Sequence, residues 1–317
     1  NNFAPADPAC RGSYQQISII DAYVDHLMSY INPANFKPLK LVVNSGNGAA
    51  GHVIDEIERR FKALAVPVEF IKVHHEPDGT FPHGIPNPLL PECRQDTADA
   101  VKAHGADMGI AFDGDGDRVF MADANGKLYD GDKLLYVIAC GQKAQGKLLG
   151  VVGTLMSNLG FEHAVGRLGL PFARAKVGDR YVLEMMHANG WKLGGENSGH
   201  IICLDRHTTG DGIIAGLQVL AALRQQGKKL EDMCADLVFY PQKLVNVPIK
   251  AGFAWADSAA IADAVKAATA ELADKGRVLL RPSGTEPLLR VMVEGEDGAM
   301  VDRLAHGLAE VVRSAAS

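Results

Sequence analysis

The chain has 317 residues, of which 47% are hydrophobic and 22% are charged, and its formal net charge at pH 7 is -6. This length and composition fit a globular protein of two or three domains, and the acidic balance argues against a nucleic-acid binder, because such proteins need basic surfaces to neutralise phosphates. The sequence has no run of 18 apolar residues, no secretory leader pattern and no CxxC pair among its five scattered cysteines, so we expect a cytoplasmic protein that does not bind membranes.

The first 125 residues contain a tail followed by an α/β pattern. Residues 1–13 are polar and Pro-rich and contain no methionine, and we expect them to be a linker or a truncated edge. Residues 14–125 alternate between helical and strand patterns, which predicts an α/β domain. The elements expected in this domain are helices over 20–31, 52–61 and 94–104 and strands over 39–44, 68–73 and 106–112.

A second alternation occupies residues 126–241, and a smaller unit occupies residues 242–317. The second domain is expected to contain helices over 131–143, 158–168, 181–188 and 212–226 and a strand over 148–153. The third is expected to contain strands over 244–249, 277–281 and 288–295 and helices over 258–274 and 297–315. The predicted fold class is therefore α/β, with two α/β/α mixed-sheet domains followed by a smaller α+β C-terminal domain.

The loop FDGDGDR places three aspartates at alternate positions, although like charges so close together disfavour joint ionisation. It follows a predicted strand, so it lies at the carboxyl edge of a sheet, where ligands gather in open α/β folds. Asp113, Asp115 and Asp117 offer the hard oxygen ligands that suit Mg²⁺. An EF-hand calcium loop does not fit, because the twelfth position is alanine and a strand precedes the loop. A plain hairpin turn is the remaining alternative, and Arg118 is either a phosphate contact or an ion-pair partner of the aspartates.

The segment RPSGTEPLLR joins two predicted strands of the C-terminal unit. It combines the hydroxyl and backbone N–H groups of Ser283, Gly284 and Thr285 with the guanidinium groups of Arg281 and Arg290. A backbone nest beside a guanidinium binds dianionic phosphate well. The alternative is a polar hairpin in which the prolines and the glycine only form the turn.

Two further loops carry polar side chains. In GGENSGH, the side chains of Glu196, Asn197, Ser198 and His200 are suited to contact sugar hydroxyls, and the alternative is a solvated loop. In ARAKVGDRYV, Lys176 is suited to shuttle a proton or to contact a phosphate, although a single lysine in a loop is usually only solvated.

Taken together and in this order, FDGDGDR, GENSGH and RPSGTEPLLR resemble the motifs of the α-D-phosphohexomutase superfamily, whose members move a phosphoryl group between the 1- and 6-positions of a hexose. The resemblance runs from about Ile20 to the C-terminus. It implies four domains around a cleft, each contributing one loop, with Mg²⁺ as the cofactor. The implied ligands are a phosphorylated hexose or hexosamine and its bisphosphate.

The resemblance also implies a role for each motif residue. The metal ligands would be Asp113, Asp115 and Asp117, and the candidates for catalytic contacts would be Arg118, Lys176 and His200. Sugar contacts would come from Glu196, Asn197 and Ser198. The phosphate that does not react would be held while the bisphosphate intermediate reverses its orientation. The residues that would hold it are Arg281, Ser283, Gly284, Thr285 and Arg290.

One departure from the superfamily pattern concerns the serine that carries the phosphoryl group. In the superfamily it lies in a Ser-His-Asn-Pro type loop of the first domain, and no serine of this sequence has that context. We therefore expect a chain that lacks the first domain, binds ligands weakly and has little mutase turnover alone. The missing domain would then be a partner supplied in trans.

A second departure is a change of subfamily near Gly116. Residues 19–112 resemble bacterial phosphomannomutases, whereas the segments from about Gly116 onward, GGENSGH among them, resemble phosphoglucosamine mutases. Because the sugar loop is of the second type, the expected reaction is conversion of glucosamine 6-phosphate to glucosamine 1-phosphate through a phosphoserine enzyme. The alternatives are a phosphomannomutase/phosphoglucomutase and a catalytically inactive sugar-phosphate-binding fragment.

Overall fold

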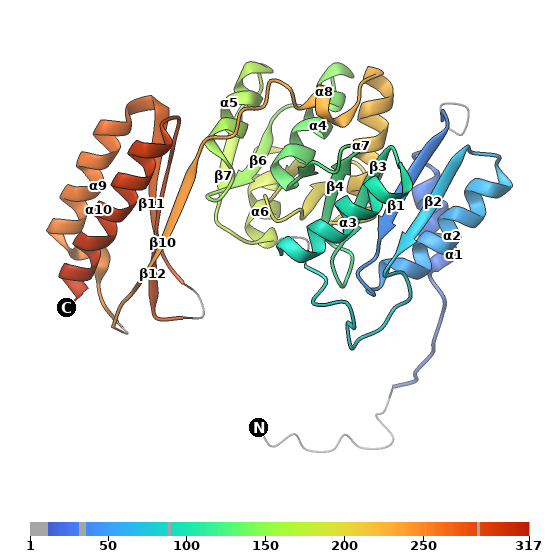
Figure 1. Ribbon diagram of the computed structural model, residues 1–317, viewed down its shortest axis with the longest axis horizontal. Coiled ribbons are helices and arrows are strands. Elements are labelled where there is room, and N and C mark those ends of the chain that lie inside the picture. Colours follow the sequence, from blue (N-terminus) through green and yellow to red (C-terminus); the bar gives the residue numbers. More distant parts are fainter. Residues whose placement is uncertain (1–11, 32–35, 88–89, 251, 284–285, 317) are drawn as a thin grey trace.

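The computed structural model describes residues 12–31, 36–87, 90–250, 252–283 and 286–316 (Figure 1). Within these ranges the strands form three sheets, each covered by helices. This confirms the predicted fold class of two mixed-sheet α/β domains and a smaller C-terminal unit. Among the described helices, none combines the length and the apolar character that a bilayer span requires.

The first sheet has the strand order β2-β1-β3-β4-β5. Its strands are β1 (Leu39–Asn44), β2 (Val68–Val73), β3 (Met108–Phe112), β4 (Val119–Asp123) and β5 (Leu128–Tyr129), and its helices are α1 (Ile20–Met28), α2 (Ala50–Ala63) and α3 (Pro91–His104). Strands β1, β2 and β3 are parallel, β4 runs antiparallel to β3, and β5 runs antiparallel to β4. Strands β4 and β5 are absent from the sequence prediction, and β5 extends the sheet beyond residue 125.

The second sheet has the order β7-β6-β8-β9, with only β9 antiparallel. Its strands are β6 (Val151–Thr154), β7 (Phe172–Ala175), β8 (Leu193–Gly195) and β9 (Ile201–Cys203). Its helices are α4 (Gly131–Ala144), α5 (Leu159–Arg167), α6 (Asp179–Asn189), α7 (Gly212–Gln226) and α8 (Leu230–Met233). The side chains of Asn158 and Asp211 cap α5 and α7, because each accepts a hydrogen bond from a backbone N–H in the first turn.

The first two sheets share one hydrophobic core. Helix α7 packs against α4, β4 and β9, and its buried residues Ile213 and Val219 belong to the same cluster as Ile110 and Val119 of the first sheet. The loops at the carboxyl ends of both sheets are therefore held by one rigid body.

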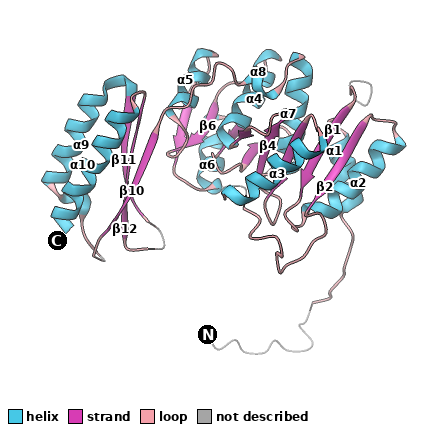
Figure 2. Cartoon of the chain, viewed as in Figure 1, coloured by secondary structure: helices cyan, strands magenta, loops and turns pink. Residues whose placement is uncertain are grey.

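The C-terminal unit has its own core. Strands β10 (Gln242–Pro248), β11 (Gly276–Pro282) and β12 (Leu288–Gly295) form an antiparallel sheet in the order β10-β12-β11, and helices α9 (Ala259–Leu272) and α10 (Gly298–Ala316) pack beside it (Figure 2). Val247, Leu289 and Val312 are among the fully buried residues of this separate cluster.

A half-buried arginine joins the C-terminal unit to the second sheet. Arg277 of β11 donates hydrogen bonds of 2.8 Å to the carbonyl oxygens of Leu155 and Ser157, in the loop after β6. On the other side it pairs with Glu294 of β12 at 2.6 Å, and Glu294 is fully buried. Arg174 of β7 donates to the same Ser157 carbonyl at 2.7 Å. Two domains therefore converge on one short loop.

Candidate functional site

The three aspartates of FDGDGDR lie in the connection between the antiparallel strands β3 and β4. One carboxylate oxygen from each of Asp113, Asp115 and Asp117 lies within 4.8 Å of the others, and the group is the one cluster of at least three such ligands among the described residues. Asp113 is buried, Asp117 half-buried and Asp115 exposed. Gly116, with φ of +79°, supplies the turn that lets the alternate side chains converge.

Arg118 lies beside two of these carboxylates. Its backbone N–H donates to Asp113 Oδ1 at 3.0 Å, and its Nε lies 3.5 Å from Asp113 Oδ2 and 3.7 Å from Asp117 Oδ1. The sequence left two roles open for Arg118, a phosphate contact or an ion-pair partner of the aspartates. The structure shows the ion pair. One guanidinium cannot balance three carboxylates, so the cluster retains a negative charge.

The electrostatics of the cluster favour a bound cation. Burial, together with the neighbouring carboxylates of Asp117 and Asp115, raises the pKa of Asp113 to about 7. Asp117 Oδ1 is buried without a hydrogen-bond partner. An orphaned oxygen among converging hard ligands fits a divalent ion.

The glycine-rich loop between β8 and β9 packs directly onto the aspartate loop. Arg118 and His200 form an isolated antiparallel bridge, and the backbone N–H of Val119 donates to the Gly199 carbonyl at 3.1 Å. His200 Nδ1 lies 3.0 Å from Asp117 Oδ2, and the ring is buried against Gly210. A Cβ on Gly210 would lie 2.1 Å from His200 Nε2, so only glycine fits there.

Two more loops fix the aspartate loop through its backbone. The N–H of Gly212, at the start of α7, donates to Gly116 O at 2.9 Å, and the N–H of Ala49, before α2, donates to Gly114 O at 2.9 Å. A Cβ on Gly48 would lie 2.5 Å from Gly114 O. These contacts were not predicted, although the turn-rich segments that provide them, NSGNGAAG and TTGDGI, can be seen in the sequence.

Glu196 connects the β8–β9 loop with the loop before α6. Its Oε1 accepts a hydrogen bond of 2.9 Å from the N–H of Gly178, two residues after Lys176. Lys176 is exposed, with Nζ 5.7 Å from the centre of the Tyr181 ring. The backbone carbonyl of Asn197 accepts from Gly131 at 3.2 Å.

Ser198 also lies in the β8–β9 loop, and its Oγ is buried without a hydrogen-bond partner. Glu196 and Ser198 thus lie in the same short loop, four and two residues before His200, which bridges to the aspartate loop. This arrangement offers an acceptor and a hydroxyl to one ligand.

The arginine hairpin between β11 and β12 lies on the C-terminal unit. Arg281 and Arg290 are directly opposite each other across the two strands, and Arg290 Nη2 donates to Ser283 Oγ at 3.4 Å. The Nε atoms of both arginines are buried without a partner. Burial, followed by the charge of Arg290, lowers the pKa of Arg281. Two adjacent guanidinium groups that repel each other fit an anion. Gly284 and Thr285 lie outside the described residues.

The structure thus brings together the aspartate loop and the β8–β9 loop, and it links Lys176 to the latter through Gly178. The arginine hairpin belongs to a different unit, and among the described residues no hydrogen bond or ion pair joins it to the other two loops. Its position relative to them is fixed in part by Arg277, and in part by Tyr240, which bonds to Glu296 of the C-terminal unit and to His163 of the second domain.

Three family models match the chain in succession. Residues 21–126 match phosphoglucomutase/phosphomannomutase alpha/beta/alpha domain II, residues 130–239 match domain III and residues 244–311 match the C-terminal domain of the same group.

Curated relatives match over nearly the whole chain. A phosphoglucosamine mutase from Aromatoleum aromaticum is 56% identical over 301 residues, which are 94% of this chain and 65% of the relative. One from Azoarcus sp. is 55% identical over 90% of this chain and 62% of the relative. The chain therefore spans a little under two thirds of the length of these relatives.

Solved structures have the same fold. A phosphoglucomutase/phosphomannomutase family protein from Burkholderia thailandensis is 27% identical, with a TM-score of 0.80 over 96% of this chain and 66% of that chain. The Aspergillus fumigatus N-acetylphosphoglucosamine mutase, solved with GlcNAc-6P and magnesium, has a TM-score of 0.72 over 93% of this chain and 70% of that chain. At 21% identity, the second likeness concerns the fold alone.

Proposed function

The chain belongs to the phosphoglucomutase/phosphomannomutase family, and from this premise we propose that it forms the metal-, sugar- and phosphate-binding part of a phosphoglucosamine mutase. Such an enzyme is an isomerase that converts glucosamine 6-phosphate to glucosamine 1-phosphate by intramolecular phosphoryl transfer. The observation that carries the proposal is the interlock of the aspartate loop with the β8–β9 loop through Arg118, Asp117 and His200. This interlock places the proposed cation site of the aspartate loop beside the β8–β9 loop, whose polar side chains are suited to bind a sugar.

We propose Asp113, Asp115 and Asp117 as the ligands of Mg²⁺, which when bound polarises a phosphoryl oxygen and neutralises charge. The chain's own groups prepare that site. Asp117 accepts from His200 Nδ1, which fixes the imidazole tautomer and leaves Nε2 unprotonated in the neutral ring. Arg118 offsets part of the carboxylate charge and limits their repulsion.

The sugar is proposed to bind at the β8–β9 loop. Glu196, oriented by the Gly178 N–H, accepts a hydrogen bond from a hydroxyl or from the 2-amino group, and Ser198 and Asn197 add polar contacts. Lys176 projects from the loop that Glu196 anchors, and we assign it the transfer of the proton to and from the reacting hydroxyl.

The phosphate that does not react is proposed to bind between Arg281, Arg290 and Ser283, with Gly284 and Thr285 outside the described residues. A site built from two guanidinium groups and a hydroxyl recognises a dianion without regard to its attachment point on the sugar. It therefore holds either phosphate of a bisphosphate intermediate while the sugar reverses its orientation.

The covalent step requires a phosphoserine, and the 317 residues contain no Ser-His-Asn-Pro type loop. We propose that a serine outside this segment provides it, so that residues 1–317 alone bind the ligand weakly and turn it over little. The test mixes the chain with the N-terminal third of the Aromatoleum aromaticum relative and assays mutase activity with a bisphosphate activator. Restored activity supports the assignment; robust turnover without the added domain contradicts it.

The substrate is tested by titration calorimetry with Mg²⁺ present. Glucosamine 6-phosphate should bind more tightly than mannose 6-phosphate, and Glu196→Gln should weaken the former by about tenfold, as expected for one charge-assisted hydrogen bond. Asp263→Asn, an exposed acid on α9, is the matched control. Equal or tighter binding of mannose 6-phosphate would instead favour the phosphomannomutase/phosphoglucomutase alternative.

A further inference from the structure

Asn47 lies in the turn between β1 and α2, directly before two residues that hold the aspartate loop. It is buried and has a φ of +56°, a left-handed conformation that asparagine tolerates better than most residues with a side chain. The next two residues meet Gly114. The Ala49 N–H donates to Gly114 O at 2.9 Å, and a Cβ on Gly48 would lie 2.5 Å from the same oxygen. The conformation of Asn47 therefore determines how these two residues reach the aspartate loop.

The polar groups of Asn47 are all bonded to the segment that follows β2. The backbone N–H donates to His74 O at 2.6 Å, and the backbone carbonyl accepts from the Asp78 N–H at 2.9 Å. The side-chain Nδ2 donates to Glu76 O at 2.8 Å, and Oδ1 accepts from His83 Nδ1 at 2.8 Å. One buried side chain and its backbone thus fix four positions of this segment.

This segment, residues 74–86, also packs on the aspartate loop. A Cβ on Gly114 would lie 3.2 Å from Pro86 Cγ and 3.6 Å from Phe81 Cζ, so both rings lie against this glycine. The segment is close to the turn of Asn47 as well, since a Cβ on Gly46 would lie 2.6 Å from Pro86 Cβ. Gly114 is therefore contacted both by the turn that contains Asn47 and by the segment that Asn47 binds.

Backbone strain is concentrated in the same place. Among the described residues, five other than glycine have positive φ, and three of them are Asn47, His74 with +43° and Phe81 with +48°. Strained backbone of this kind persists only where surrounding contacts hold it, and it gathers at functional sites. The hydrogen bond from Asn47 and the stacking of His74 on His83, with ring centres 4.0 Å apart, are such contacts.

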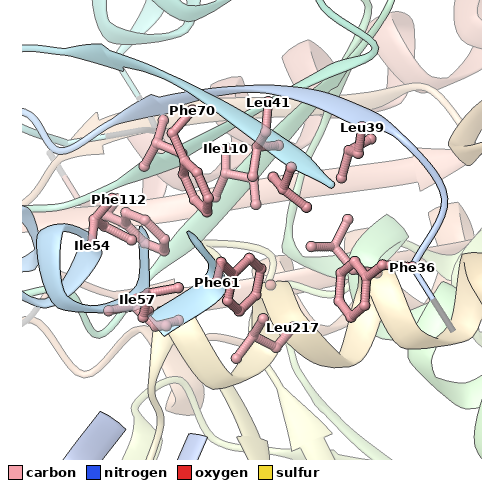
Figure 3. Close-up of a pocket in the computed structure, with 15 residues that line it drawn as sticks. Phe36, Leu39, Leu41, Ile54, Ile57, Phe61, Phe70, Ile110, Phe112 and Leu217 are labelled. Atoms are coloured by element: carbon pink, nitrogen blue, oxygen red, sulfur yellow. The ribbon is translucent and has the colours of Figure 1, made fainter. Parts of the chain in front are cut away.

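The two ends of the aspartate loop are anchored in other ways. Phe112, directly before Asp113, is buried, and Figure 3 shows it with Ile54 of α2 at the same end of an apolar cavity against the first sheet. At the other end, the Val119 N–H is bonded to the β8–β9 loop. Gly114 has no side chain that could anchor it, so its position depends on the turn and the segment that Asn47 joins.

We propose that Asn47 is a positioning residue of the cation site. It acts on Gly114 through the next two residues of its own turn and through the 74–86 segment. Gly114 lies between Asp113 and Asp115, so its position sets the separation of these two ligands. Asn47 itself does not touch the cation. The inference rests on the proposed function, because it takes the aspartate loop as the cation site.

The test compares side-chain variants of the full 317-residue chain by Mn²⁺ titration, followed by electron paramagnetic resonance. Asn47→Gly keeps the left-handed backbone and removes both side-chain bonds, so it should fold and bind Mn²⁺ about tenfold more weakly, the lower end of the effect of outer-shell partners. His83→Leu, at an exposed position, removes one of the two bonds and should weaken binding by a smaller factor. Asn125→Gly, at an exposed position between β4 and β5, is the matched control and should change nothing.

Hydrogen exchange without metal gives a second readout. Asn47→Gly should speed exchange in peptides covering residues 111–119, where the N–H groups of Gly116 and Arg118 bond to Asp113, and the control should not. A merely structural role predicts lower stability in urea with unchanged Mn²⁺ affinity and unchanged exchange in these peptides, and that result overturns the proposal. If instead Asp117→Asn leaves Mn²⁺ binding unchanged, the assignment of the cation site itself is wrong, so the two failures are distinguished.

Discussion

The aspartate loop and the arginine hairpin are both connections between two antiparallel strands, and both concentrate like charges. The former is held by backbone hydrogen bonds from three other segments, at Ala49, Gly199 and Gly212. The latter makes contacts only within the C-terminal unit among the described residues, chiefly Arg290 to Ser283. That unit reaches the second domain through contacts that include those of Arg277. The proposed cation site is therefore pre-organised inside one core, whereas the proposed phosphate site depends on how a separate unit is docked.

Substitution of Arg277, which joins the C-terminal unit to the second domain, should have the largest effect on stability. Arg277→Met removes two hydrogen bonds to the second domain and leaves Glu294 buried and unpaired, so we expect a loss of about 3–5 kcal/mol in the free energy of unfolding. Urea unfolding measures it. Arg303→Met, which breaks the exposed pair with Glu271 in the same unit, should cost less than about 1 kcal/mol. Equal effects of the two variants would contradict the docking role.

Metal affinity tests whether the aspartate loop is pre-organised to bind a cation. Asp117→Asn should weaken Mn²⁺ binding by roughly 100-fold or more, because loss of a ligand exceeds the 10–100-fold typical of outer-shell partners. Calorimetry or electron paramagnetic resonance measures it, with Asp263→Asn as the control. Since the pKa of Asp113 is raised to about 7 and the ion requires the ionised form, affinity should fall as the pH drops below 7. A flat pH profile would contradict this account.

Asp132 supports the loop to which Arg277 docks, and it gives a pH test. It is fully buried, accepts from the Asn158 N–H at 2.7 Å, and burial and Asp130 raise its pKa to about 8. Between the ordinary pKa and 8 the folded state holds a proton that the unfolded state has lost, so stability falls as the pH rises through that window. Asp132→Asn should reduce the slope of unfolding free energy against pH by up to about 1.4 kcal/mol per pH unit. Thermal unfolding from pH 5 to 8 would show an unchanged slope if this is wrong.

The smallest effect is expected at α1. Tyr23 donates a hydrogen bond of 2.6 Å to Asp211 Oδ2, and Asp211 also caps α7, whose first residue holds the aspartate loop. Tyr23→Phe should cost about 1–2 kcal/mol of unfolding free energy and weaken Mn²⁺ binding only slightly. A strong loss of Mn²⁺ affinity would mean that the aspartate loop is less pre-organised than its backbone contacts indicate.

Many helices and strands of this fold can be predicted from the sequence. The runs LKLVVN, VEFIKV and LLRVMVEG correspond residue for residue to β1, β2 and β12, because each is a nearly continuous apolar run bounded by turn residues. Strand β4 was missed because it follows the glycine-rich loop at once and has no separate boundary. Strand β7 was not predicted, because Arg174 interrupts its apolar pattern and part of the strand was read as loop.

The site was only partly predictable for a related reason. Alternation with glycine predicts that the three aspartates converge, since it depends on local backbone geometry. The contacts of His200 with Asp117 and of Glu196 with Gly178 join residues 83 and 18 positions apart. The role of Arg277 depends on backbone carbonyls 120 and 122 positions away, which no side-chain pattern reveals.

The most direct test of the central claim places Mn²⁺ in the aspartate loop and measures the ³¹P relaxation of glucosamine 6-phosphate bound to the same chain. The account predicts enhanced relaxation that disappears with Asp117→Asn, and loss of sugar-phosphate binding with Arg281→Ala. If the sugar phosphate binds but its ³¹P relaxation ignores the metal, the two loops do not serve one ligand and the account is wrong.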